Sequence, residues 1–168
     1  VEDGVKYVIE PGWVDKDKMA IYGGSHGGYA TLMGLVKTPD LYACGVDYVG
    51  VSNIFTFMNS IPEYWKPYLD MLKEIWYDID NEEEAAIARE ASPAYQIDKI
   101  KSPLVVGQGA NDPRVNINES DQIVEKLRAK GVDVPYMVKY NEGHGFAHEE
   151  NSIDFYKAML GFLAKYLK

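Results

Sequence analysis

Basic residues, cysteines and long apolar runs are all scarce in this sequence of 168 residues. The 17 Lys and Arg residues are outnumbered by 26 Asp and Glu residues, and the net charge of -9 argues against nucleic acids and anionic membranes as partners. No apolar run reaches the length of about 18 residues that a membrane-spanning helix needs. The single cysteine, Cys44, excludes an internal disulfide bond, and such low cysteine usage favours a cytoplasmic location.

Histidine is also rare, since the sequence has only 3, at positions 26, 144 and 148. This scarcity limits the side chains that can act as a general base near neutral pH. A zinc site is one alternative, because His144 and His148 have the i, i+4 spacing of helical metal ligands and Glu149 follows them. The glycines on both sides of His144 oppose a helix there, and no His-Glu-x-x-His pattern is present, so we expect neither a metal nor a cofactor.

Glycine and apolar residues, by contrast, are concentrated around Ser25, in the segment Met-Ala-Ile-Tyr-Gly-Gly-Ser-His-Gly-Gly-Tyr at 19–29. An apolar strand that runs through Gly-x-Ser-x-Gly into a helix is typical of a nucleophile elbow, in which a strained turn exposes the serine hydroxyl. We expect glycine to be required at positions 23 and 27, because a side chain at either Gly23 or Gly27 would keep the strand and the helix from passing closely. The backbone N–H of His26 is the natural donor to an oxyanion. A glycine-rich turn without a catalytic role is the alternative.

Candidates for the acid and the base follow Ser25 in the order that this type of turn requires. Asp112 comes just after an apolar run at 103–109 that is typical of a buried parallel strand. His144 follows a second apolar run at 134–140, and the ordinary pKa of imidazole, about 6.5, suits a proton shuttle held by a carboxylate. Asp112 stands in an Asn-Asp-Pro context that also favours an Asx-turn, so a purely local role is an alternative. Cys44 is a weaker nucleophile than Ser25, because it lies in an apolar run without a nearby basic group.

Six segments together resemble the catalytic domain of the prolyl oligopeptidase family of serine peptidases, particularly its acylaminoacyl-peptidase and dipeptidyl-peptidase branches. They are Val-Asp-Lys-Asp-Lys at 14–18, Gly-Gly-Ser-His-Gly-Gly-Tyr at 23–29, Ser-Pro-Ala-Tyr at 92–95, Lys-Ile-Lys-Ser-Pro at 99–103, Gly-Ala-Asn-Asp-Pro-Arg-Val at 109–115 and Glu-Gly-His-Gly-Phe at 142–146. The segments keep the family's order and extend over nearly the whole chain. The resemblance implies a peptidase that acts on peptides through an acyl-enzyme, with Ser25 as nucleophile, Asp112 as orienting acid and His144 as base.

The resemblance also suggests where a substrate side chain binds. Val115 is similar in position to an apolar wall of the pocket, and Tyr64 and Trp65 are the best candidates within the aromatic-rich segment 51–78. Ordinary core packing is the alternative for any one of these aromatic residues. At Gln108 the sequence departs from the histidine that is common in the family, at a position that is usually structural.

The pattern of apolar runs and turns predicts an α/β fold with a mostly parallel sheet of about four strands flanked by helices. We expect strands at 18–22, 43–50, 104–107 and 134–140, and helices at 2–9, 27–37, 82–89, 119–130 and 152–166. The resemblance identifies this arrangement as the C-terminal half of an α/β-hydrolase fold, so that residues 1–168 form a partial catalytic domain. It implies further strands and a propeller domain upstream of residue 1.

A partial sheet leaves one edge of the strand at 18–22 unpaired. Unpaired strand edges recruit partner strands, so we expect a homo-oligomer formed through this edge. No residue here matches the second oxyanion donor of the family, and the loss of one such donor costs about 100- to 1,000-fold in turnover. A carboxylesterase with the same three residues, and a catalytically weak fragment that self-associates, are therefore alternatives.

Overall fold

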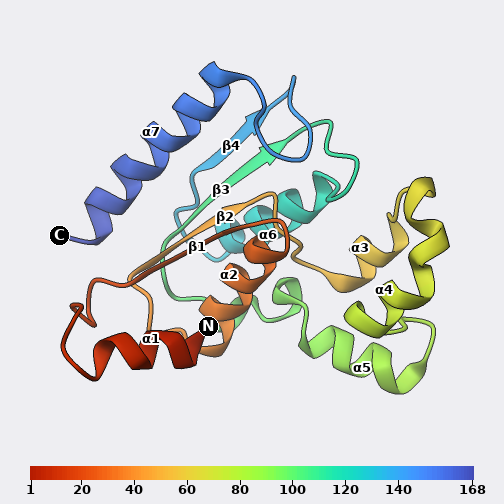
Figure 1. The fold of residues 1–168 in the computed structure, drawn as a ribbon, viewed down its shortest axis with the longest axis horizontal. Helices are drawn as coiled ribbons and strands as arrows, with labels where there is room; N and C mark the ends of the chain where they lie inside the picture. The colour runs from red at the N-terminus through yellow and green to blue at the C-terminus, as the bar shows by residue number, and fades with distance from the viewer.

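The computed structural model describes all 168 residues, Val1–Lys168, as a parallel sheet flanked by helices (Figure 1). The four strands lie side by side in the order in which they occur along the chain, and all pairs are parallel. They are β1 (Ala20–Gly24), β2 (Cys44–Tyr48), β3 (Leu104–Gly109) and β4 (Tyr136–Lys139). The fold class and the four strands are as expected, although the strand ends differ from the predicted ones by up to two residues.

Helices cover both faces of the sheet. In chain order they are α1 (Glu2–Ile9), α2 (His26–Lys37), α3 (Ile54–Asn59), α4 (Leu69–Trp76), α5 (Glu82–Glu90), α6 (Asn118–Ala129) and α7 (Glu149–Tyr166), with the 3-10 segments η1 (Glu63–Tyr68), η2 (Pro93–Tyr95) and η3 (Ile97–Lys99). Figure 1 shows α2 and α6 on one side of the sheet and α7 on the other. None of these helices combines the length and the apolar character that a membrane crossing needs.

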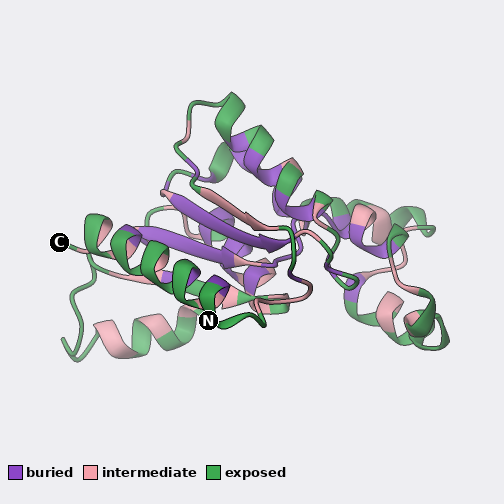
Figure 2. Ribbon diagram, turned by 90° about the horizontal axis from the view of Figure 1, so that it is seen from above, coloured by how far each residue is buried: buried purple, intermediate pink, exposed green.

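The central strands bury side chains toward both helical layers, which explains why the sequence has near-continuous apolar runs at these strands. Leu104 and Val106 of β3 pack with Leu32 and Leu35 of α2. Val105 points the other way and packs with Phe155 of α7. In Figure 2 the central strands β2 and β3 are accordingly coloured mostly as buried, between helices whose outer surfaces are exposed. The two layers fix the sheet and therefore the positions of the loops at its carboxyl end.

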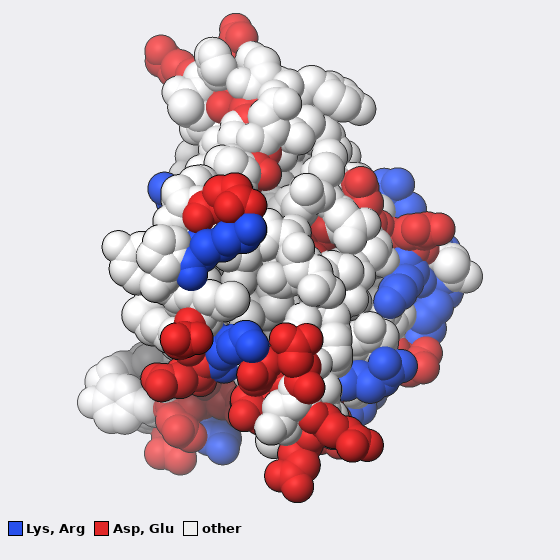
Figure 3. Space-filling view, turned by 90° about the vertical axis from the view of Figure 1, so that its right-hand side faces the viewer, with Lys and Arg blue, Asp and Glu red and all other residues white.

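The segment between β2 and β3 forms a helical excursion, α3 to α5, on the right-hand side of Figure 1. Its own apolar cluster includes Phe57 and Trp76, which lie 5.1 Å apart between ring centroids. Asn81 caps α5 by accepting from the Glu83 and Glu84 N–H groups. Figure 3 views the molecule from this side, where Lys and Arg side chains lie beside Asp and Glu rather than forming a continuous basic surface.

Candidate active site

Ser25 occupies a sharp turn between β1 and α2, at the carboxyl end of the sheet. Its backbone has φ 57° and ψ -117°, a positive-φ conformation that residues other than glycine rarely adopt. The Ser25 N–H donates to Tyr48 O at 2.9 Å, and Ser25 O accepts from the Tyr29 N–H at 3.1 Å, so both sheet and helix hold the turn. This arrangement places the hydroxyl beside the unpaired N–H groups in the first turn of α2.

Close packing at this turn requires glycine at two positions, of which only one was expected. A Cβ atom on Gly23 would lie 2.8 Å from Gly27 Cα, so glycine is required there, as predicted. The expectation for Gly27 is wrong, because a Cβ atom on it would meet nothing within 4 Å. Gly28 is the crowded position instead: its Cβ would lie 2.6 Å from Gly50 Cα and would clash with Asp47 Oδ1. The first turn of α2 therefore packs directly on β2 and the loop that follows it.

Asp112, His144 and Ser25 lie together although they follow three different strands. His144 Nε2 is 2.9 Å from Ser25 Oγ, and His144 Nδ1 is 2.8 Å from Asp112 Oδ2. A carboxylate at this position accepts the proton on Nδ1, so the lone pair of Nε2 faces the serine hydroxyl, which donates to it. The Asp112 side chain is fully buried and that of His144 is 17% exposed. The distance from Nε2 to Oγ lies in the range in which a base can take a hydroxyl proton.

The Asp112 carboxylate is held from both of its oxygens. Oδ1 accepts from the Arg114 and Val115 N–H groups, each at 2.9 Å, and the first of these bonds is that of an Asx-turn. Gln108 is fully buried and donates from Nε2 to Val115 O at 3.2 Å, with the same nitrogen 3.5 Å from Asp112 Oδ2. The Ser120 hydroxyl donates to Gln108 Oε1 at 2.8 Å. Gln108, where the sequence departs from the family pattern, therefore packs as part of the support of the Asp112 loop.

Aromatic rings pack against the first residue of α2. The His26 ring centroid is 5.8 Å from that of Tyr29 and 5.4 Å from that of Trp76, which are 4.9 Å from each other. Trp76 belongs to the aromatic-rich segment 51–78, but neither Trp76 nor Tyr29 was predicted as a site residue. As the first residue of α2, His26 also places its backbone N–H where the helix itself offers no acceptor.

The predicted substrate-pocket residues lie in different surroundings. Tyr64 is exposed in η1. Trp65 lines a hollow of about 160 Å³ with Tyr68, Met71 and Leu72. Val115 is 2% exposed and packs in the apolar cluster of the helical excursion. Their role in substrate binding stays a prediction.

A second hollow, of about 280 Å³, borders His144 and is lined by residues that include Tyr48, Phe146, Phe155 and Tyr156. The Phe146 N–H donates to the Tyr48 hydroxyl oxygen. Burial raises the pKa of Tyr48 to about 12, although the bond from Phe146 acts in the opposite direction. The Tyr48 phenol is therefore neutral near physiological pH and borders His144 without a charge.

The alternative reactive residues have other surroundings. His148 Nδ1 lies 2.9 Å from Glu142 Oε1, whereas His144 pairs with Asp112, so the two rings contact different carboxylates. No group of three or more His, Cys, Asp or Glu side chains is arranged to hold a metal ion. Cys44 is fully buried, and burial raises the pKa of its thiol, which disfavours the reactive thiolate.

Asp47 and Glu119 are buried carboxyl groups near the site that were not predicted from the sequence. Glu119 of α6 accepts from the Ser52 and Asn53 N–H groups at 3.0 and 2.8 Å and so ties the loop after β2 to α6. Asp47 of β2 is fully buried beside the first turn of α2. The burial of Asp47 could have been suspected from the sequence, because it is a lone acidic residue inside an apolar strand. Glu119 has no sequence feature that distinguishes it from a solvated helix residue.

Comparisons with known proteins cover the whole chain. The family model described as "Prolyl oligopeptidase family" matches residues 1–168. The dipeptidyl aminopeptidase BIII of Pseudoxanthomonas mexicana is 46% identical over 165 residues, which are 98% of this chain and 24% of that protein. The dipeptidyl peptidase family member 6 of Caenorhabditis elegans is 39% identical over 166 residues, covering 98% of this chain and 22% of its own length.

A solved structure shares the fold over nearly the whole chain. The puromycin-hydrolysing peptidase of Mycobacterium tuberculosis superimposes with a TM-score of 0.89 at 25% identity, over 98% of this chain and 24% of that one. The present chain thus spans about a quarter of the length of the relatives that it matches.

Proposed function

The chain belongs to the prolyl oligopeptidase family, and on this premise we propose that it cleaves peptide bonds with Ser25 as nucleophile, His144 as base and Asp112 as orienting acid. The reaction class is acyl transfer to a serine followed by hydrolysis. The observation that carries the proposal is the continuous line of contacts from Asp112 through His144 to Ser25, at 2.8 and 2.9 Å.

Acylation begins when Ser25 Oγ attacks the carbonyl carbon of the scissile bond and His144 Nε2 takes the hydroxyl proton. The charge of the resulting tetrahedral intermediate resides on the former carbonyl oxygen. His144 then gives its proton to the leaving nitrogen, the C–N bond breaks, and an ester on Ser25 remains. Asp112 stays ionised throughout and stabilises the imidazolium that forms between the two proton transfers.

Deacylation repeats these steps with water as the nucleophile. Water attacks the ester carbon and gives a proton to His144 Nε2, the bond to Ser25 Oγ breaks, and His144 returns the proton to the serine. The products are a free carboxylate and the regenerated hydroxyl. In both halves we propose the His26 N–H as the oxyanion donor, supported by its position at the start of α2, where unpaired N–H groups and the helix dipole favour negative charge.

The proposed substrate class is a peptide. Two of the similar proteins are named as dipeptidyl peptidases, which supports an amide rather than an ester as the bond cleaved by this chain. A carboxylesterase would use the same three residues, so the preference between the two bonds has to be measured directly.

Labelling with a fluorophosphonate probe tests the proposed nucleophile. The probe should label the native chain at Ser25, Ser25→Ala should lose the label, and the matched variant Ser60→Ala should keep it, since Ser60 Oγ donates only to Phe57 O. Cys44→Ser should also keep it. Equal labelling of Ser25→Ala and the native chain would place the reactive group elsewhere.

The same proteins serve to test the substrate class. We expect a dipeptidyl p-nitroanilide to be cleaved with a larger kcat/KM, relative to its uncatalysed rate, than a p-nitrophenyl ester. A chain that is labelled at Ser25 and cleaves only the ester would instead be a carboxylesterase.

We further propose that the chain self-associates through the edge of β1. In the sheet β1 pairs with β2 alone, and alternate residues of β1 direct their N–H and C=O groups away from β2. Such an edge can pair with the same edge of a second copy across a two-fold axis, which satisfies the free backbone groups of both chains.

A further inference from the structure

The loop between β4 and α7, residues 140–148, carries His144 between two glycines. Gly145 has φ 95°, a positive-φ backbone conformation that favours glycine. A base on such a segment keeps its position only if other groups hold the loop.

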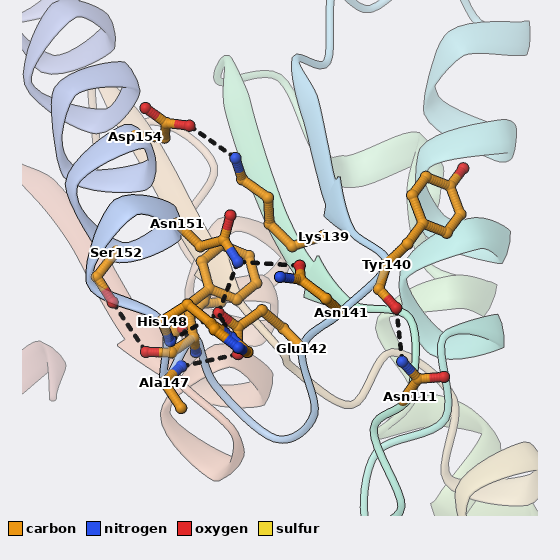
Figure 4. A network of polar contacts seen from close by, with 12 residues as sticks. Asn111, Lys139, Tyr140, Asn141, Glu142, Ala147, His148, Asn151, Ser152 and Asp154 are labelled. Carbon is orange, nitrogen blue, oxygen red and sulfur yellow. Dashed lines mark hydrogen bonds and ion pairs between the residues drawn. The ribbon is translucent and has the colours of Figure 1, made fainter.

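The carboxylate of Glu142 closes this loop across its base (Figure 4). It is 2% exposed and accepts from the Ala147 N–H at 2.8 Å, the His148 N–H at 2.9 Å and Asn151 Nδ2 at 2.7 Å. His148 Nδ1 is also 2.9 Å from Glu142 Oε1. One side chain thus joins the start of the loop to its end and to the first turns of α7, with His144 in between.

The backbone of the same segment is joined to the loop that carries Asp112. The Asn111 N–H donates to Glu142 O at 2.9 Å, and Asn111 Nδ2 donates to Tyr140 O at 2.6 Å. A Cβ atom on Gly109 would lie 2.8 Å from Glu142 O, so the two loops meet backbone to backbone. Asp112 and His144 each lie close to this contact between the two loops. The contact therefore helps to fix the distance between their side chains.

We propose that Glu142 is a positioning residue, which holds the His144 loop closed against the Asp112 loop and so keeps His144 Nδ1 on Asp112 and Nε2 on Ser25. This role rests on the proposed function of the three residues, but the geometry that it maintains can be observed without turnover. Glu142 touches neither the substrate nor the reacting atoms in the proposed mechanism and acts only through the backbone around His144.

The charge of Glu142 suits this role. Burial by itself would raise the pKa of the carboxyl group, but the hydrogen bonds from Asn151, Ala147 and His148 together outweigh burial and lower the pKa to about 2. The group therefore stays a carboxylate over the whole range in which an imidazole base operates, and its hydrogen bonds are charge-assisted.

The decisive comparison uses Glu142→Ala, Glu142→Gln and the matched control Asp154→Asn. Asp154 pairs with Lys139 at 2.8 Å and joins β4 to α7 in the same region, without contacting the loop. For each variant we would record the low-field NMR resonance of the imidazole proton between His144 and Asp112, thermal unfolding, and the rate of fluorophosphonate labelling at Ser25.

If Glu142 positions His144, Glu142→Ala weakens or removes the low-field resonance and slows labelling on the order of 100-fold, the loss typical of misplacing a catalytic group by about 1 Å. Glu142→Gln, which keeps an oxygen acceptor, should recover part of both signals. Asp154→Asn should change neither. A folded Glu142→Ala or Glu142→Gln protein with the native resonance and the native labelling rate would overturn the proposal.

The readouts also separate this inference from the proposed function. If the native chain shows the low-field resonance but is not labelled, the proposed hydrolase activity fails. Loss of the resonance in a folded Glu142→Ala protein would still support positioning in that case. Its retention would contradict positioning.

Discussion

The buried carboxyl group of Asp47 has little compensation from hydrogen bonds. It is fully buried, and neither of its carboxyl oxygens has a hydrogen-bond partner of normal geometry. Burial raises its pKa to about 7, the backbone N–H of Gly50 offsets only part of this effect, and the nearby Glu119 adds to it. The group lies against Gly28, in the first turn of the helix that follows Ser25.

The raised pKa of Asp47 predicts a loss of stability with rising pH. Because the folded state binds the Asp47 proton more tightly than the unfolded state, the free energy of unfolding should fall as pH rises from about 4 to about 7, by up to a few kcal/mol at about 1.4 kcal/mol per pKa unit. Burial also raises the pKa of Glu119, which contributes with the same sign. Asp47→Asn, which cannot ionise, should remove most of this slope.

Urea unfolding at about pH 5 and about pH 8 measures the effect. Asp154→Asn is the control, because the pKa of Asp154 is lowered by Lys139 and its contribution has the opposite sign. An Asp47→Asn variant with the same dependence on pH as the native chain would show that Asp47 is not responsible.

Asp112 shows how far single residues could be interpreted from the sequence. The sequence suggested either an Asx-turn or a partner for the histidine, and the structure contains both, since one oxygen serves Arg114 and the other serves His144. Two acceptor oxygens on one carboxylate make the two roles compatible. Glu142 and Glu119 could not be identified in this way, because half of the partners of each carboxylate are backbone N–H groups, which carry no sequence signal.

At the scale of elements, the crossing of β1 and α2 depends on which glycine faces the sheet. Gly27 precedes Gly28 by one residue, which on a helix corresponds to a rotation of about 100°. That rotation directs a side chain at 27 into open space and one at 28 into β2 and the loop that follows it. The Gly-x-Ser-x-Gly pattern alone does not reveal this difference, because it fixes spacing along the chain and not the direction of each Cα–Cβ bond.

Alanine at these two glycines should therefore have opposite effects on stability. Gly28→Ala should lower the free energy of unfolding by about 1–3 kcal/mol or more, because Gly50 and Asp47 occupy the space of the methyl group. Gly27→Ala should be neutral or stabilising by up to about 1 kcal/mol, since alanine is the better helix former and meets no atoms. Thermal or urea unfolding of the pair gives the answer, and equal destabilisation of both would contradict it.

The predicted helices agree with the structure where the apolar periodicity of the sequence was strong. The helix at 2–9 coincides with α1, and Glu82–Glu90 lies within one residue of its expected end. No individual helix was predicted within the aromatic-rich segment 51–78, because its aromatic residues follow no single helical period. The division into α3, η1 and α4 depends instead on packing around Trp76.

For the molecule as a whole, the edge of β1 governs the expected state in solution. We predict concentration-dependent self-association in sedimentation velocity at micromolar concentration, by pairing of β1 edges. Tyr22→Lys places a charge in this strand at a residue that is 48% exposed and should shift the equilibrium toward monomer. Tyr7→Lys, on the exposed surface of α1, should not.

A native chain that sediments as a monomer at all concentrations would contradict the prediction. So would association that Tyr7→Lys weakens as much as Tyr22→Lys does. The comparison therefore tests the surface used as well as the tendency to associate.

The meeting of Ser25, Asp112 and His144 could be anticipated at this scale, since parallel strands end at one edge of the sheet and the three residues each follow a strand. The surroundings of Tyr64 and Trp65 could not be. They depend on how η1 packs against α4, two short segments that were not predicted from the sequence.

Ser25 and His144 are 119 positions apart in the sequence, and this separation determines when each of them is synthesised. At a synthesis rate of about 5–20 residues per second, the histidine leaves the ribosome roughly 6 to 24 seconds after the serine. Because β1 to β4 occupy the sheet in chain order, the emerging protein can add each strand beside the previous one, and the elbow is complete long before its base exists. During translation the nascent chain therefore carries a serine without a base, so the proposed hydrolase cannot act on its neighbours before its own folding is finished.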